Sequence, residues 1–144
     1  MKKKLIKSRP ESVRKNYEEI CKILDVVRTS TAQLGDRFRK IYENKNYQII
    51  LGDNKGTFKE FLADPRIDKS FPQVIKLIKN NEKYIQEMGL RLHELYELDN
   101  ERLYRARLLV TPETIWDWLE RMRTLSRADF NHFCKHGNLP QDET

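Results

Sequence analysis

Helix-start signals recur along this chain, and they constrain its fold more than any other feature. A capping box places Ser or Thr at the N-cap and an acid or amide three residues later, so that each side chain satisfies a backbone group of the first turn. The chain carries such pairs at Ser8 with Glu11, Thr57 with Glu60, Ser70 with Gln73, and Ser126 with Asp129. With only five glycines and five prolines in 144 residues, the intervals between the starts favour helices. The sequence therefore predicts an all-α single domain of about six or seven helices.

Residues 57–84 contain two of these starts in close succession. Thr57 caps a helix with the sequence TFKEFLAD, and Pro65 ends it because the residue before proline is disfavoured in the α region. Ser70 caps the next helix, with Pro72 in the first turn, where no N–H group is needed. Two short helices joined by a tight turn indicate a central helix-turn-helix at about 57–84, whose second helix would lie in a DNA major groove.

The second of these helices has two distinct faces. Val74, Ile78, Asn81 and Ile85 fall on one side at a helical spacing of about 100° per residue. The opposite side carries the five residues of the predicted reading stripe, namely Lys69, Gln73, Lys76, Asn80 and Lys83. Lysine neutralises phosphate, and the amides hydrogen-bond to adenine edges. The same pattern is also typical of a solvated helix face, so periodicity leaves both interpretations open.

A seven-residue repeat of apolar side chains runs through the amino-terminal part of the chain. The repeat consists of Val13, Ile20, Val27, Leu34 and Ile41, with Tyr17, Leu24, Thr31 and Phe38 at the second seam position. It predicts either one long helix from about residue 10 to 45 or two helices broken near Thr29–Thr31, and its continuous register favours the single long N-terminal helix. The 13–41 heptad seam pairs with a second copy as a coiled coil or packs against its own chain. We favour self-packing and keep a homodimer as the alternative.

Further helices and turns follow from local signals. Gly52 lies in a turn within the 44–55 linker, and Gly89 ends the second helix of the 57–84 pair. Shorter helices are predicted over about 90–99, from about 100 onwards with Asp99 or Asn100 as its cap, and from Thr111-Pro112. A last helix runs from Ser126 to Gly137. The predicted organisation is thus a flexible basic arm at 1–9, a helical domain at 10–137 and a frayed tail at 138–144.

The charge of the chain suits a polyanionic partner. Its net charge is +6 and its pI is about 9.3. Residues 1–9 contain five basic residues and no acid, and Lys2, Lys3 and Lys4 are candidates for contacts with phosphates or with a minor groove. A solubilising terminus explains the same composition.

Signals of enzymatic chemistry are close to absent. The sequence has no glycine-rich phosphate loop, nucleophile elbow or HExxH, so we predict no catalytic residue, cofactor or small-molecule substrate. His132, Cys134 and His136 are zinc-ligand types, but Cys134 leaves the helix face that the two histidines share and a fourth ligand is not evident. We therefore predict no metal. Cys21 and Cys134 lie outside CxxC spacing and no apolar run reaches membrane-spanning length, which predicts a cytoplasmic protein without membrane contact.

The order of several sequence landmarks resembles a diffuse group of small helical proteins from phages, plasmids and other prokaryotic mobile elements. The landmarks are FRKIYENKNYQ, GTFKEFLAD, VIKLIKNNEKYI and ELDNERLYRARLLVTPETIWDWLERMRTLSRADF, and they cover roughly residues 35–134. The resemblance implies a helix-turn-helix and DNA binding. It also implies that Thr57, Phe58, Glu60 and Phe61 belong to the first helix and its packing face. In the second helix, Ser70 would be the cap, Leu77 and Ile78 would be buried, and Tyr84 would occupy a position that is aromatic in the group.

These observations predict a non-enzymatic duplex-DNA-binding protein, a regulator or accessory factor of a mobile element. Lys69, Gln73, Lys76, Asn80 and Lys83 would contact the duplex, and the amino-terminal lysines would contact phosphates. One alternative is a helical protein–protein interaction module that uses the 13–41 seam. Another is an RNA or ribonucleoprotein-binding protein that uses the arginines at 102, 105, 107, 121, 123 and 127.

Overall fold

The computed structural model describes residues 9–25 and 31–142, and all the regular structure in these ranges is helical. Eight α-helices follow one another along the described chain: α1 (Pro10–Asp25), α2 (Thr31–Glu43), α3 (Asn46–Leu51), α4 (Phe58–Leu62), α5 (Phe71–Asn80), α6 (Asn100–Ala106), α7 (Ile115–Thr124) and α8 (Arg127–His136). A π-helical segment, η1 (Asn81–Glu87), continues α5, and two 3₁₀ turns, η2 (Leu92–Leu95) and η3 (Pro140–Asp142), complete the list. The predicted all-α fold is confirmed.

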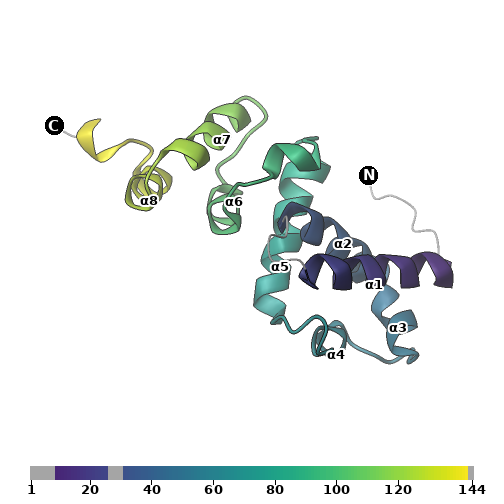
Figure 1. The fold of residues 1–144 in the computed structure, drawn as a ribbon. Helices are drawn as coiled ribbons and strands as arrows, with labels where there is room; N and C mark the ends of the chain where they lie inside the picture. The colour runs from purple at the N-terminus through teal and green to yellow at the C-terminus, as the bar shows by residue number, and fades with distance from the viewer. Residues whose placement is uncertain (1–8, 26–30, 143–144) are drawn as a thin grey trace.

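The helices form two groups on either side of α5 (Figure 1). Helices α1 to α4 lie around α5 at one end of the molecule, and α6, α7 and α8 follow one another toward the other end. Each group has its own buried core. The amino-terminal cluster contains Tyr17, Phe38, Phe61 and Ile78 among others, and the carboxy-terminal cluster contains Tyr84, Trp118, Leu119 and Phe130 among others. The continuous helix α5–η1 contributes to both clusters and therefore joins them.

The amino-terminal heptad repeat is divided between two helices. The single long helix favoured by its register was wrong, because α1 ends at Asp25 and α2 begins at Thr31. The two helices pack side by side, and Asn16 of α1 both donates to the Arg37 carbonyl (3.3 Å) and accepts from the Arg37 guanidinium (3.2 Å). Val13, Ile20, Leu34 and Ile41 are all buried by the chain itself, whereas Val27 lies outside the described residues. The preference for self-packing over dimerisation agrees with this burial.

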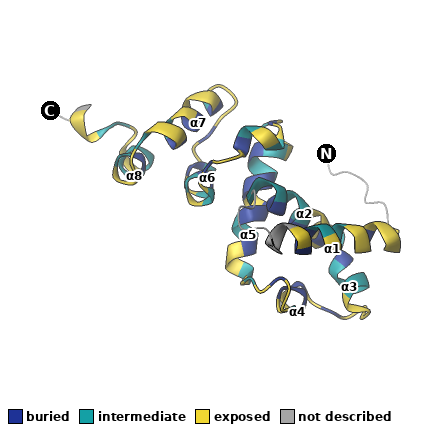
Figure 2. Cartoon of the chain, viewed as in Figure 1, coloured by how far each residue is buried: buried dark blue, intermediate teal, exposed yellow. Residues whose placement is uncertain are grey.

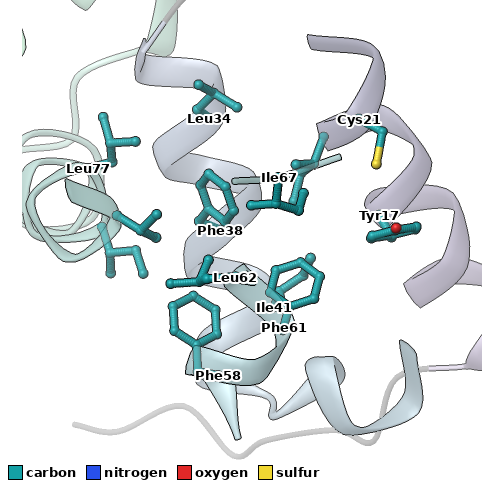
Figure 3. Packing of buried hydrophobic residues seen from close by; sticks show 13 residues of the cluster. Tyr17, Cys21, Leu34, Phe38, Ile41, Phe58, Phe61, Leu62, Ile67 and Leu77 are labelled. Carbon is teal, nitrogen blue, oxygen red and sulfur yellow. The ribbon is translucent and has the colours of Figure 1, made fainter. Parts of the chain in front are cut away.

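Close approach of two helices explains why a glycine, Gly35, lies inside helix α2. A β-carbon on Gly35 of α2 would lie 2.6 Å from the backbone oxygen of Leu77 in α5. That distance is too short for any side chain, and a backbone atom within a helix cannot easily move away. Gly35 therefore lets α2 and α5 pack against each other, with Phe38 and Leu34 of α2 filling the space beside the contact (Figure 3).

Arginine side chains cover the aromatic rings of the carboxy-terminal cluster. The Arg102 guanidinium lies 5.2 Å from the centre of the Phe130 ring, and the Arg121 guanidinium lies 4.0 Å from that of Phe133. Arg102 also donates to the carbonyls of Met122 (2.8 Å) and Leu125 (2.7 Å), which the end of α7 leaves without helical partners. One side chain thus links α6, α7 and α8.

Most predicted helix ends are found where the sequence places them. Helix α1 begins at Pro10. Backbone N–H groups in the first turns of their helices donate to the side chains of Thr57, Ser70, Asp99 and Ser126. Gly89 and Gly137 have positive φ and follow helix ends. Three predictions were wrong. The 44–55 linker contains helix α3, the helix predicted over about 90–99 is only the 3₁₀ turn η2, and helix α7 begins at Ile115 because Thr111 and Thr114 bond to each other in a preceding turn.

Candidate nucleic-acid interface

Helix α5, the predicted reading helix, is held on two sides. Its most extensive contacts are with α2, followed by α6 and by its own continuation η1. Val74 and Ile78 face the amino-terminal cluster, as the periodicity predicts, and both are fully buried. Figure 2 shows that the start of α5 is exposed and that burial increases along the helix. Only part of the face opposite α2 is therefore open to a ligand.

Asn80 does not lie on an open face, and its predicted contact with bases is corrected by the structure. The residue is 4% exposed, and its side-chain nitrogen donates to the backbone carbonyl (3.1 Å) and the side-chain oxygen (2.7 Å) of Asn100. The first turn of α6 packs across this part of α5. An amide buried and bonded in this way joins two helices, and it is not available to an adenine edge.

Lys76 and Lys83 are already paired within the protein. The Lys76 ammonium lies 3.1 Å from a carboxylate oxygen of Glu101 and 5.4 Å from the centre of the Tyr104 ring, and its side chain is 34% exposed. Lys83 forms an ion pair of 2.6 Å with Glu87, one helical turn further along. Part of the positive charge that the stripe would offer to phosphates is therefore neutralised by neighbouring acids.

The exposed part of the stripe lies at the start of α5. Lys69 and Lys79 have no ion-pair partner among the described residues; Lys69, just before the helix, is partly exposed, and Lys79, in its last turn, is exposed. Gln73 is exposed too, but its side-chain oxygen accepts from the Ser70 backbone N–H (3.0 Å) and so closes the capping box. Sequence reasoning missed Lys79 because it lies roughly 80–100° around the helix from the centre of the predicted stripe. Knowledge of where α6 packs would have been needed to find it.

Helices α4 and α5 have the caps and the order of the predicted pair. Thr57 Oγ1 accepts from the Glu60 N–H (3.2 Å), and Ser70 with Gln73 forms a complete capping box. Phe58 of α4 lies edge-on to Phe71 of α5, with ring centres 6.1 Å apart, and the Lys59 ammonium sits 5.7 Å from the same Phe71 ring. Helix α4 has only five residues, however, and α5 rests mainly on α2.

The amino-terminal arm holds most of the net charge. Lys2, Lys3 and Lys4 lie outside the described residues, so their predicted contacts are known from sequence alone. Residues 1–9 contain 5 of the 28 basic residues and none of the 22 acidic ones, which leaves 23 basic and 22 acidic residues for 10–144. The body of the protein is therefore close to neutral. Long-range attraction of a polyanion would therefore come mainly from the charge of the arm.

The six arginines of the RNA-binding alternative divide into two sets. Arg102 bonds to the end of α7, Arg107 lies 3.7 Å from the centre of the Tyr104 ring, and Arg121 stacks on Phe133. These three side chains have structural contacts. Arg105 and Arg127 are exposed without a partner among the described residues, and Arg123 is 4.0 Å from Glu120 in an exposed, weak pair. The second set is available to a ligand.

The buried tyrosines and cysteines pack within the fold, and their surroundings keep them protonated. The Tyr17 hydroxyl donates to Asp64 (2.5 Å), and the Tyr84 hydroxyl donates to the Leu103 carbonyl (2.6 Å). Burial raises the pKa of both tyrosines above the ordinary value, and it also raises the pKa of the Cys21 and Cys134 thiols. Groups with raised pKa values stay protonated near neutral pH, so none of these four is an activated nucleophile.

The described residues offer no assembled metal site. No group of three or more His, Cys, Asp or Glu side chains that could hold an ion is found among them. The rings of His132 and His136 have centres 4.4 Å apart, and His132 Nδ1 lies 2.9 Å from the Asn138 carbonyl oxygen. Cys134 packs against the carboxy-terminal cluster.

Comparisons with known proteins leave the origin of the chain open. Within the described part of the chain, no helix combines the length and the apolar character needed to cross a membrane. The resemblance to helical proteins of mobile elements rests on short degenerate motifs, and it remains a prediction. The chain matches no family model, no curated protein sequence and no solved structure.

Proposed function

We propose that this protein is a non-enzymatic duplex-DNA-binding protein, as expected of a regulator or accessory factor of a mobile element. The docking surface is the exposed face of α5, from Lys69 before its start to Lys79 in its last turn, together with α4 and the turn between them. Lys69 and Lys79 contact phosphates, Lys59 lies over the Phe71 ring at the start of α5, and Gln73 approaches base edges with its amide nitrogen. Asn80 has no part in this surface, since it is buried against α6.

The observation that carries the proposal is the exposed amino-terminal turn of a firmly supported helix. In helix-turn-helix proteins the residues at the start of the second helix contact base edges. Here Ser70, Pro72 and Gln73 are exposed at that position, while Val74, Leu77 and Ile78 anchor the same helix to the amino-terminal cluster. A reading helix must be held rigidly, and α5 meets this requirement through its contact with Gly35.

The amino-terminal arm supplies the electrostatic share of the affinity. Its five basic residues account for most of the net charge of +6. Each phosphate contact in duplex DNA contributes about 0.9 to the slope of log affinity against log salt concentration. The arm therefore raises affinity for any duplex, and the α5 surface provides whatever preference for sequence the protein has.

Salt-dependent binding to a random-sequence duplex tests this division of roles. Replacing Lys69 and Lys79 together by glutamine should lower the affinity and reduce the salt slope by about 2, because two phosphate contacts are lost. Replacing Arg14 and Lys15 of α1 by glutamine removes the same charge from a distant exposed helix and is the matched control. Equal effects of the two double variants would count against docking through α5.

A second function is favoured by exposed apolar side chains near the turn between α6 and α7. Leu108 is 81% exposed and Trp116 is 59% exposed, and Leu109 is exposed as well. Large apolar side chains on a surface often mark contacts with another protein. An interaction module would therefore use this region, since the described residues of the 13–41 seam are buried within the chain.

Light scattering and DNA titration separate the two functions. A DNA-binding protein should keep its duplex affinity when Leu108 and Trp116 are replaced by serine, whereas an interaction module should lose self-association or partner binding. Selection from random duplex DNA is the decisive experiment for the first proposal. Recovery of no enriched sequence, together with weak binding that does not respond to salt, would leave the interaction module as the better explanation.

A further inference from the structure

The second set of arginines lines a hollow between the three carboxy-terminal helices. A space of about 550 Å³ is bounded by Tyr96, by Asp99 and Arg102 at the start of α6, and by Arg123 and Arg127 at the junction of α7 and α8. A second space of about 250 Å³ is bounded by Arg105 of α6 and Asn131 of α8. The two spaces share Asp99, Arg102 and Arg127 as lining residues, so they adjoin each other, and together they are called the trough.

The acidic residues of the trough are largely satisfied inside the protein. Asp99 accepts from the Arg102 backbone N–H (3.1 Å) and thereby caps α6, while Glu101 accepts from the Lys76 ammonium (3.1 and 3.3 Å). Glu97 has no partner among the described residues. Carboxylates that are bonded in this way contribute less negative potential to the trough than their number suggests.

The basic residues of the trough are largely unsatisfied. Arg105 and Arg127 are exposed and have no hydrogen-bond or ion-pair partner among the described residues, and Arg123 has only the 4.0 Å contact with the exposed Glu120. Arg102 is fixed by its bonds to the Met122 and Leu125 carbonyls and keeps its charge at the floor of the trough. Three available guanidinium groups and one fixed one therefore face two carboxylates without a cationic partner, Glu97 and the helix-capping Asp99.

We infer that this trough binds single-stranded nucleic acid. Its spaced guanidinium groups suit successive phosphates of a strand, since arginine binds phosphate with paired N–H donors. Tyr96, which lines the larger space, is 38% exposed, and its hydroxyl accepts from Gln33 (3.1 Å). An exposed aromatic ring beside a basic groove is a stacking platform for an unpaired base, and a duplex has no such base face to offer.

This inference does not rest on the proposed duplex binding. The trough lies on α6, α7 and α8, whereas the duplex surface lies on α4 and α5. The two sites can therefore be tested with separate ligands and separate variants. Fluorescence anisotropy with labelled dT12 probes the trough, and the same label on a duplex with random sequence probes the α5 surface.

The main test replaces Arg105, Arg123 and Arg127 together by glutamine. The salt slope for dT12 should fall by about 2, because each phosphate contact of a single strand contributes about 0.7. The control variant carries glutamine at Arg14, Lys15 and Lys55, which removes the same charge from exposed positions outside the trough. An equal loss of dT12 affinity in both triple variants would overturn the inference, since it would show that net charge alone matters.

Tyr96 tests the stacking part of the inference. Tyr96→Ala should weaken dT12 binding roughly fivefold or more, whereas Tyr96→Phe keeps the ring and should bind like the unaltered protein. Circular dichroism and thermal unfolding show whether each variant folds. Loss of binding in Tyr96→Phe, or equal competition by inorganic polyphosphate at the same phosphate concentration, would contradict recognition of bases. If the variant with Lys69 and Lys79 replaced loses duplex binding but keeps dT12 binding, the result supports the α5 surface and leaves the inference about the trough unaffected.

Discussion

The two hydrophobic clusters are closed off from water in different ways. In the amino-terminal cluster, helices approach closely enough for apolar side chains to cover one another, as Gly35 against Leu77 shows. In the carboxy-terminal cluster, the helices are seven to ten residues long, and the guanidinium groups of Arg102 and Arg121 lie over the rings of Phe130 and Phe133. Long arginine side chains bury their methylene groups over apolar surface and keep their charge near water. Within this one region, some arginines thus cover the core and others remain open to ligands.

This difference bears on how basic residues should be interpreted. Arg102, Arg107 and Arg121 resemble Arg105, Arg123 and Arg127 in sequence, yet the first three have contacts within the fold and the second three are exposed at the trough, which Arg102 also lines. Substitutions that remove one residue from each cluster can test the comparison, beginning with the largest expected effect.

Phe38→Ala should destabilise the protein most. Phe38 is fully buried at the centre of the amino-terminal cluster, and loss of a buried phenylalanine typically costs about 3–5 kcal/mol. Urea unfolding followed by circular dichroism measures the change in the free energy of unfolding. A loss below about 1 kcal/mol would show that this cluster does not rest on close apolar packing.

Arg102→Met should destabilise the carboxy-terminal cluster by roughly 1.5–3 kcal/mol, because the substitution keeps the apolar stem but leaves two carbonyls without their charged donor. Hydrogen exchange should locate the loss of protection in α6, α7 and α8. Arg105→Met, at an exposed position on the same helix, is the control and should change the stability little. Similar results for the two variants would remove the distinction between structural and available arginines.

Gly35→Ala should destabilise the protein by about 1–3 kcal/mol, although the same change inside an exposed helix stabilises it by about 1 kcal/mol. The reversed sign follows from the 2.6 Å approach of a β-carbon to the Leu77 oxygen. Thermal unfolding of the variant measures the sign directly. Increased stability would mean that α2 and α5 are not in close contact.

The smallest effect concerns pH and compares one tyrosine from each cluster. Burial raises the pKa of Tyr17 and Tyr84 in the folded protein, so the unfolded chain loses its phenolic protons first as the pH rises above about 10. Stability is therefore complete below that pH and falls above it. Tyr17→Phe and Tyr84→Phe should each flatten this decline, as measured by urea unfolding between pH 8 and about 11. An unchanged decline in either variant would show that the tyrosine is not protected from ionisation by the fold.

Local sequence signals predicted local structure well. Capping residues such as Ser70 and Ser126 act through their own first turn, so the chain nearby contains all the information. The buried stripe of α7, consisting of Ile115, Trp118, Leu119 and Met122, also follows from periodicity alone.

The predicted reading stripe was wrong at Asn80 for a different reason. Periodicity separates apolar from polar positions, but it does not separate a polar face in water from a polar face against another helix. Asn80 is polar because it bonds to Asn100, and Lys76 is basic opposite Glu101. The partner helix, α6, begins 20 residues beyond Asn80, and the sequence of α5 does not indicate that α6 packs there. For the same reason, the heptad repeat could not predict whether the segment is one helix or two. The register of the repeat is equally compatible with one helix and with two that pack together.

The π-helical segment η1 has a consequence for the geometry of the whole molecule. Its hydrogen bonds span five residues, as from the Met88 N–H to the Lys83 carbonyl (3.0 Å), so it contains more residues per turn than an α-helix. The neighbouring residues Asn80 and Asn81 are both buried here, with Asn80 bonded to α6 and Asn81 accepting from Arg39 of α2 (2.5 Å). A residue inserted or deleted between Asn81 and Glu87 would turn the following chain by about 100° around the helix axis. The relative orientation of the proposed duplex surface and the trough thus depends on the length of one short segment, and a chain that differed there would present the two surfaces to different sides.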